Sequence, residues 1–333
     1  MSQLPDGTFA YRWFNSGLGR NQITLRSTGG DVVYDTTMTI VGFTRDHTKL
    51  IVSGGASMRI YEVASGLFDE VSFGATTSVY AIHPSRPEVL VGRVTQAFLE
   101  WYDFEEDSYT ATGITVSGTG IAEFNPAGDT LFLTKNSSPY LLLFDADTLE
   151  SLPNPYTDVT NYINAEPRLS VAFNRVLPQV AMSLTGDRWM GVFNTNDGQY
   201  IWDIYNPDSA WAYWLSFNPA GDLLSVSSDA FSLSTHTRIC DAFTPVNGPA
   251  VVVRNIGTPS AAGFVHGVFT GDGDSMVVCN HPTLASSIIN ARTGDVLEAL
   301  DGNANSMVGL PPYSAPVIGD LFWTRRTRTQ EII

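Results

Sequence analysis

The five histidines have the widest chemical repertoire of the side chains in this 333-residue chain, because imidazole acts as an acid, a base or a metal ligand near neutral pH. Three of them, His47, His83 and His281, fall in expected turns. His236 lies in a segment without a clear pattern, and His266 lies on an expected inner strand. No two have the spacing of metal ligands on one element. His266 is the best candidate for a polar group facing the interior of the fold, and we expect it to be structural. The histidines therefore predict no metal site.

Two acidic stretches could bind cations. Asp272-Gly273-Asp274 resembles the beginning of a calcium loop, but Ser275 and Met276 do not supply the further oxygen ligands that such a loop needs. We therefore expect a solvated turn there. Glu105-Glu106-Asp107 is predicted as the acidic tip of a hairpin, which is solvated unless a partner brings an arginine to it. We keep Glu105, Glu106 and Asp107 as candidate partner-binding residues.

An aromatic run offers the flat faces on which sugar rings stack. Strict alternation places Trp211, Tyr213, Leu215 and Phe217 on one face of an expected strand and Trp214 on the other. Core packing explains the first face best. Trp214 is left as a candidate contact for a protein partner, a cell-surface glycan or a receptor. No Gly-x-Ser-x-Gly, phosphate-loop or Cys-His nucleophile pattern occurs, so no catalytic residue and no cofactor are predicted.

The C-terminal segment 324–333 is basic, whereas the chain as a whole is acidic. The segment contains Arg325, Arg326 and Arg328, and the chain has 34 acidic and 18 basic residues, a net charge of −16. Such a negative field disfavours binding to nucleic acid or to anionic membranes. The basic segment has two interpretations, a solvated chain end or an arm that docks on a partner. Its three arginines are candidate partner-binding residues.

Composition and the first residues exclude other classes of protein. No apolar stretch approaches the ~20 residues that span a bilayer, and the N-terminal residues lack the basic and apolar regions of a signal peptide. Cys240 and Cys279 are too few for a disulfide framework, and we expect both to be buried apolar residues, with a bridge between them left open. These features predict a cytoplasmic or virion protein without membrane insertion.

One stretch that occurs twice predicts the strands and turns that position these residues. Phe-Asn-Pro-Ala-Gly-Asp stands at 124–129 and again at 217–222. Alternating apolar residues lead into it and an apolar run follows, which predicts a strand, a tight turn and a strand. Weaker copies are in register, with the proline position or its equivalent at 5, 45, 84, 126, 175, 219 and 271. The mean interval of ~44 residues predicts seven propeller blades of four antiparallel strands.

The first repeat has one strand too few, and the end of the chain supplies one more. We predict that Val317 to Trp323 pairs with Thr8 to Phe14, so that the C-terminal strand closes the ring of blades. The predicted fold is therefore all-β, a single seven-bladed β-propeller over residues 1–323 followed by the basic tail 324–333.

The repeats resemble the WD-repeat-like and YVTN-like seven-bladed propellers. The resemblance rests on the turn residues and on strands that end in an aromatic residue and Asp, as in Trp101-Tyr102-Asp103 and Leu143-Phe144-Asp145. Trp202-Asp203 is the sole literal Trp-Asp pair, on an expected outer strand, and the Gly-His dipeptide of the family is absent. The resemblance implies a platform for protein partners rather than a catalyst.

We therefore expect a non-enzymatic structural or protein-interaction subunit of a larger assembly. Its acidic, lysine-poor composition resembles that of tailed-phage virion proteins of the tail, the baseplate or the head decoration. One alternative is a lactonase-like propeller enzyme that would use His266 and neighbouring polar groups. The other is a propeller that binds a carbohydrate or a receptor. Departures from the repeat period at 153–168, at 231–263 and after Trp323 are where we expect partners to dock.

Overall fold

The computed structural model describes most of the chain. The described part consists of strands and turns. The described residues are 9–15, 20–27, 30–35, 38–116, 119–135, 141–156, 170–183, 188–205, 212–228, 237–243, 251–256, 265–270, 273–280, 285–300 and 303–309. The candidate residues Arg325, Arg326 and Arg328 lie outside them, as do the predicted strand 317–323 and residues 157–168 of the first expected insertion.

The described strands pair into seven four-stranded antiparallel sheets. In chain order they are β1 (Phe9–Asn15), β2 (Arg20–Ser27), β3 (Gly30–Asp35), β4 (Thr39–Phe43), β5 (Lys49–Gly54), β6 (Ser57–Glu62), β7 (Phe68–Ser72), β8 (Thr77–Ile82), β9 (Glu88–Arg93), β10 (Phe98–Asp103), β11 (Ser108–Thr115), β12 (Thr119–Phe124), β13 (Thr130–Lys135), β14 (Leu141–Asp145), β15 (Ser151–Leu152), β16 (Val171–Phe173), β17 (Gln179–Ser183), β18 (Arg188–Asn194), β19 (Tyr200–Tyr205), β20 (Ala212–Phe217), β21 (Leu223–Ser228), β22 (Thr237–Asp241), β23 (Val252–Ile256), β24 (Val265–Phe269), β25 (Ser275–Asn280), β26 (Ala285–Asn290), β27 (Val296–Leu300) and β28 (Asn303–Gly309).

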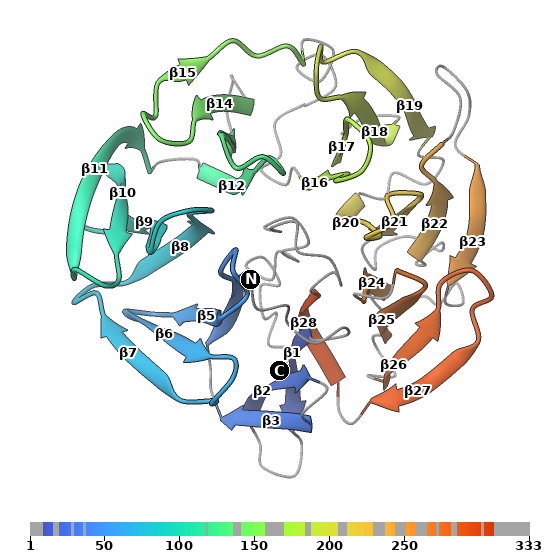
Figure 1. Cartoon of the computed structure of the whole chain (residues 1–333), viewed down its shortest axis with the longest axis horizontal. Coiled ribbons are helices and arrows are strands. Elements are labelled where there is room, and N and C mark those ends of the chain that lie inside the picture. The colour runs from blue at the N-terminus through green and yellow to red at the C-terminus, as the bar shows by residue number, and fades with distance from the viewer. Residues whose placement is uncertain are drawn as a thin grey trace, which may run out of the picture.

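Six of the sheets are each built from four consecutive strands, and Figure 1 shows the sheets arranged as blades around a common axis. The first strand of each blade is the innermost and the fourth is at the periphery. The remaining sheet is composite, because its order is β28-β1-β2-β3 and its inner strand comes from near the end of the described chain. The β-propeller fold with four-stranded antiparallel blades is thus as predicted.

The strand that completes the N-terminal sheet differs from the predicted one. β1 pairs with β28, with Phe9 opposite Gly309 and Phe14 opposite Asn303. The strand beside β1 is therefore Asn303–Gly309 and not Val317–Trp323, which lies outside the described residues. The prediction was wrong because Asn303–Gly309 carries Asn, Ser and Gly, a composition that resembles a loop, whereas 317–323 has the apolar residues typical of a strand.

The apolar core is a series of layers between neighbouring blades. One layer joins the blade β16–β19 to the blade β20–β23, where fully buried Trp202 packs with Leu215, Phe217 and Val226. Each blade is apolar on both faces for this reason, and burial of such layers is the main favourable contribution to folding. Cys240 belongs to the same layer as a buried free thiol, as predicted.

The duplicated hexamer forms the turn between the first and second strands of its blade. The Oδ1 atom of Asn125 accepts three backbone N–H groups of the turn at 2.9 to 3.1 Å, and its Nδ2 donates to Asp129 over 2.7 Å. Gly128 has a φ of 81°, in the left-handed region that favours glycine. Asn218 and Asp222 repeat the arrangement in the second copy. The motif is therefore a self-capped turn with little room for substitution.

Candidate functional site

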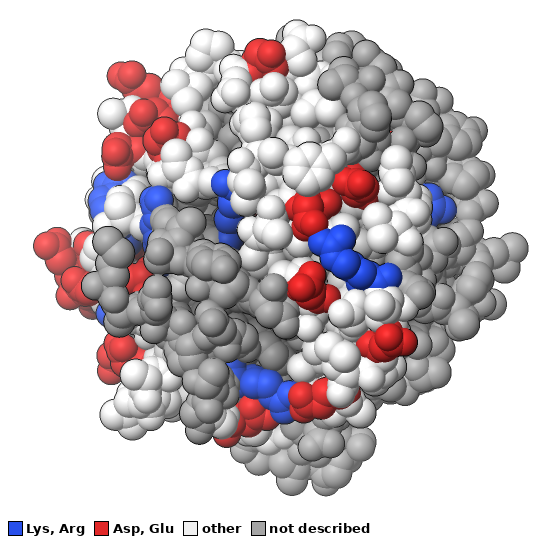
Figure 2. Space-filling model, turned by 45° about the vertical axis from the view of Figure 1, so that its right-hand side comes forward, with Lys and Arg blue, Asp and Glu red and all other residues white. Residues whose placement is uncertain are grey.

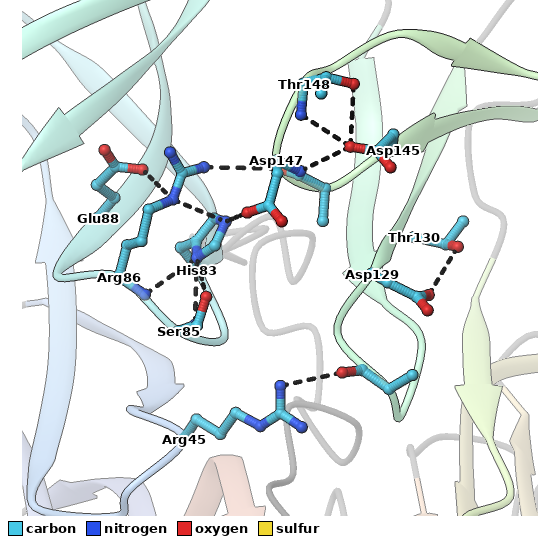
Figure 3. Close-up of polar contacts among 12 residues, drawn as sticks. Arg45, His83, Ser85, Arg86, Glu88, Asp129, Thr130, Asp145, Asp147 and Thr148 are labelled. Atoms are coloured by element: carbon cyan, nitrogen blue, oxygen red, sulfur yellow. Dashed lines mark hydrogen bonds and ion pairs between the residues drawn. The ribbon is translucent and has the colours of Figure 1, made fainter.

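The turns between the first and second strands gather at one end of the propeller, and we call them the axial turns. They comprise residues 44–48, 83–87, 125–129, 174–178 and 218–222. Arg45 shows how close they lie, because its Nη1 donates to the carbonyl oxygen of Ala127 in another blade over 3.1 Å (Figure 3). A Cβ atom added at Gly128 would collide with the guanidinium of Arg45 and with Pro84. Gly128 therefore permits both the turn and this approach.

His83 takes the place of asparagine in its axial turn (Figure 3). Its Nδ1 accepts the backbone N–H groups of Ser85 and Arg86 at 3.2 and 3.1 Å, as Oδ1 of Asn125 does in its own turn. Burial, together with the positive charge of Arg86, lowers the pKa of His83 to about 4. The imidazole is therefore neutral at pH 7, and its hydrogen bonds identify it as a structural cap.

The residues around His83 hold neighbouring turns together. Arg86 lies 3.2 Å from Glu88, between Nε and Oε2, and its guanidinium carbon is 5.9 Å from the centre of the Trp101 ring. Oδ1 of Asp145 accepts the backbone N–H groups of residues 147 and 148 at 3.1 and 2.8 Å in the facing turn (Figure 3). The hydrogen bonds of His83 and Asp145 cap their own turns, whereas Oε2 of Glu88 and Nε1 of Trp101 make no hydrogen bond within the described residues.

His47 differs from the other residues of the axial turns. It stands at the position of Gly128 in its turn, because its backbone N–H donates to the carbonyl oxygen of Thr44 as that of Gly128 does to Asn125. Its φ is 62°, which is uncommon for a residue with a Cβ atom. His47 is 8% exposed, and its Nε2 has no hydrogen-bond partner among the described residues. Sequence reasoning placed His47 in a turn but missed this exchange of glycine for histidine.

A second candidate site lies on the periphery, where large apolar residues are exposed on outer strands. We call these residues the outer apolar surface; their exposed fractions are 41 to 72%, and they are Val251, Val252, Val253, Val296, Leu297, Val32, Val33, Leu67 and Phe68. They belong to β23, β27, β3 and β7 or directly precede them, and Figure 1 shows these strands following one another around the ring. The outer strands β11, β15 and β19 have no such residue among their described side chains.

The charges near this surface are mostly paired. Arg26 bridges two blades, because it lies 2.8 Å from Asp31 and 2.6 Å from Glu298. Arg59 lies 2.8 Å from Glu70 on β7. Figure 2 shows one side of the molecule, where several basic groups lie directly beside acidic ones.

The described candidates for partner binding, the acidic turn and Trp214, lie in different blades. Glu105 and Glu106 are exposed at the turn between β10 and β11, where their backbone N–H groups donate to Asp103, while Asp107 accepts the hydroxyl of Tyr102 over 2.8 Å. These bonds explain the turn without a partner. Trp214 lies on the inner strand β20, opposite Ser227 of β21.

Other candidate chemistry finds little support in the described part of the chain. His266 lies on the inner strand β24, as predicted, opposite Cys279. No group of three or more His, Cys, Asp or Glu residues that could hold a metal ion occurs within the described ranges. Asp272 of the calcium-loop-like stretch is outside those ranges. None of the described elements is a helix long and apolar enough to cross a membrane.

Comparisons with known proteins support the fold. No protein-family profile and no curated protein match the chain. Among solved structures, the dihydro-heme d1 dehydrogenase NirN in complex with DHE has a TM-score of 0.63 and 11% identity, over 93% of this chain and 75% of that one. KlAtg21 in complex with the coiled-coil of AgAtg16 has a TM-score of 0.60 and 13% identity, over 83% and 85%. Apo AztD from Citrobacter koseri has a TM-score of 0.60 and 9% identity, over 90% and 96%.

At these identities the likeness shows the fold alone, and the chain is a β-propeller. The same comparison corrects one expectation. We predicted that the chain is not an enzyme because the propeller fold implied a platform, but a dehydrogenase is among the similar structures. The fold therefore does not separate an enzyme from a binding protein, and only its sites can.

Proposed function

We propose that this propeller is a protein-binding subunit of a larger assembly and that it binds an extended segment of a partner protein along its outer strands. The observation that carries the proposal is the outer apolar surface. Single exposed apolar residues are ordinary, but here each of four neighbouring outer strands, taken together with the residue that precedes it, exposes at least two large ones. Apolar area of this kind gains free energy when a partner removes it from water.

The backbone at this surface favours strand addition. β23, β27, β3 and β7 are the last strands of their sheets, so one edge of each has no strand partner within the described residues. An extended peptide can complete such an edge with main-chain hydrogen bonds, while its side chains contact the exposed apolar ones. By contrast, β15 has only two residues and offers almost no edge. Binding should therefore be restricted to one arc of the ring.

The charge of the surface indicates the kind of segment. β27, β3 and β7 carry five acidic residues, namely Glu298, Asp31, Asp35, Asp69 and Glu70, and no basic one. The guanidiniums that pair with three of these carboxylates come from the adjacent strands, Arg26 on β2 and Arg59 on β6. The chain as a whole has a charge of −16. A segment that alternates apolar and basic residues complements both properties.

The test uses a synthetic peptide of alternating valine and lysine, with a valine-glutamate peptide of equal length for comparison. We expect the valine-lysine peptide to bind and to slow amide exchange in β27, β3 or β7 but not in β15. The double substitution Val32→Lys, Val33→Lys should weaken binding at least tenfold. Val94→Lys is the matched control, because Val94 is 72% exposed but does not lie on an outer strand. Absence of binding, or equal binding by the double variant, would reject the proposal.

Other expectations remain proposals. We infer that the composite sheet is the seventh blade of a closed ring like those of WD-repeat-like propellers. Its inner strand β28 contacts β4 on one side and β24 and β25 on the other, which supports this inference. A phage virion as the assembly rests on composition, and partner docking by Arg325, Arg326 and Arg328 or by Trp214 rests on sequence. These stay predictions, as does binding of a cell-surface glycan.

A further inference from the structure

Arg45 differs from those described basic residues that pair with a carboxylate. Six other described basic residues each lie within 4.0 Å of a carboxylate, namely Arg26, Lys49, Arg59, Arg86, Arg93 and Arg292. Arg45 has no carboxylate at that distance among the described residues, and its one hydrogen bond there is to the carbonyl oxygen of Ala127. Burial lowers its pKa, so the environment does not offer the charge a compensating group. A half-buried guanidinium of this kind is suited to a ligand that brings the negative charge.

His47 provides an independent indication of a ligand, two residues along the same turn. Its side chain is buried, and its Nε2 makes no hydrogen bond within the described part of the chain. An unsatisfied buried polar atom costs about 1–3 kcal/mol, so its presence needs an explanation. The backbone adds to this cost, because histidine occupies a left-handed position that glycine fills at Gly128 and Gly221. Selection for the turn alone would favour glycine.

A further positive charge lies close to this turn. Burial and the charge of Arg175, from the axial turn of another blade, lower the pKa of His47 below its ordinary value. The charge of Arg45 likewise helps to lower the pKa of His83. Arg45 and Arg175 both stand at the proline position of the repeated turn, since each directly follows its capping residue, Thr44 or Asn174. Two arginines therefore stand where the turns depart from the motif, and the carboxylate of Asp46, between Arg45 and His47 in the sequence, opposes part of the effect of Arg175 on His47.

We propose that the axial end of the propeller binds a small oxyanion, of the carboxylate or phosphate class, between Arg45 and His47. The guanidinium presents paired N–H donors that match two oxygens of such a group. The neutral imidazole donates its Nε2 hydrogen to a third oxygen or to the second lone pair of one already bound. Arg175 adds attraction through its charge. The site is distinct from the outer apolar surface, so it does not depend on the proposed binding of a partner strand.

The experiment measures thermal unfolding of the full-length protein in increasing inorganic phosphate or acetate, each compared with chloride at equal ionic strength. We expect a saturable rise in Tm, as for any ligand that binds only the folded state. Arg45→Gln should raise the apparent Kd at least tenfold, and His47→Gly should do the same while restoring the glycine of the motif. Arg59→Gln is the matched control, because Arg59 is paired with Glu70 on the periphery, and it should respond like the unaltered protein.

The two anions distinguish the sources of the ligand. A stronger response to phosphate indicates a phosphate group, and a stronger response to acetate indicates a carboxylate such as that of a protein segment. The imidazole resonances of His47 provide a second readout, and they should shift with the same apparent Kd. No saturable rise with either anion would overturn the proposal. So would an equal rise in the Arg45→Gln and His47→Gly proteins, even if both fold normally.

Discussion

Nδ2 of Asn174 donates to the carbonyl oxygen of Gly221 over 2.7 Å, and so joins the axial turns of two neighbouring blades. Asn218 makes the same bond to Gly273 over 3.0 Å in the next pair of blades. Asn174 and Asn218 therefore do two things, because Oδ1 caps the turn of each while Nδ2 reaches the following blade. A residue that looks like local turn chemistry in the sequence also contributes to the packing of the ring.

The first prediction separates these two contributions. Asn174→Ala removes the cap and the bond to the next blade, whereas Asn125→Ala removes only a cap, since the described bonds of Asn125 stay within its own turn. Leaving the buried carbonyl of Gly221 unpaired costs about 1–3 kcal/mol. We therefore expect Asn174→Ala to lower the free energy of unfolding by about that much more than Asn125→Ala, as measured by urea denaturation. Equal losses would show that the bond between blades contributes nothing.

The second prediction concerns the strained turn at His47. Replacing His47 by glycine removes the left-handed strain and a buried Nε2 that has no hydrogen bond to any described residue, so the free energy of unfolding in anion-free buffer should rise by about 1 kcal/mol. The reverse control is Gly221→Ala, which should destabilise the protein. The backbone at residue 221 has a φ of 73°, which an alanine rarely adopts, and the added Cβ would collide with Asn174. A loss of stability in His47→Gly would mean that the imidazole stabilises the fold rather than a ligand.

The third prediction is a dependence of stability on pH that comes from His83. Its pKa is about 4 in the folded protein and about 6.5 when unfolded, so the unfolded chain binds more protons between these values. The free energy of unfolding should therefore fall by up to about 3 kcal/mol as the pH decreases from 6.5 to 4. Above pH 6.5, His83 should cause no change of stability with pH.

His83→Asn is the variant that tests this dependence. Asparagine caps the equivalent turns at Asn125 and Asn174, so the turn should stay folded while the titrating group is lost. Urea midpoints at pH 7 and at pH 4.5 should differ less in the variant than in the unaltered protein. Burial also lowers the pKa of His47, which will leave a residual slope in both proteins. Parallel pH profiles would remove His83 as the cause.

The repeated hexamer made the fold predictable, because its asparagine, glycine and aspartate form a turn through contacts within six residues. Strand positions then followed from the period. The partner of β1 was not predictable in the same way, since β28 is a strand by virtue of a pairing with residues 289 to 300 positions away. The axial site was visible only as departures from the motif: Arg45 replaces proline and His47 replaces glycine. Comparing the copies position by position would have found both residues.

The last prediction uses the corrected partner strand of β1. If the composite sheet closes the ring, the inner strand β28 stabilises the molecule by covering β1 and by contacting the blades on either side, through β4, β24 and β25. A chain that ends after Gly309 keeps this strand, whereas a chain that ends after Leu300 loses it and exposes the edge of β1. We expect the chain that ends after Gly309 to unfold cooperatively near the Tm of the full-length protein. The chain that ends after Leu300 should aggregate or melt far lower, because an exposed edge strand in a ring is a site of association. Equal melting of the two truncated proteins would show that β28 is not needed for the stability of the ring.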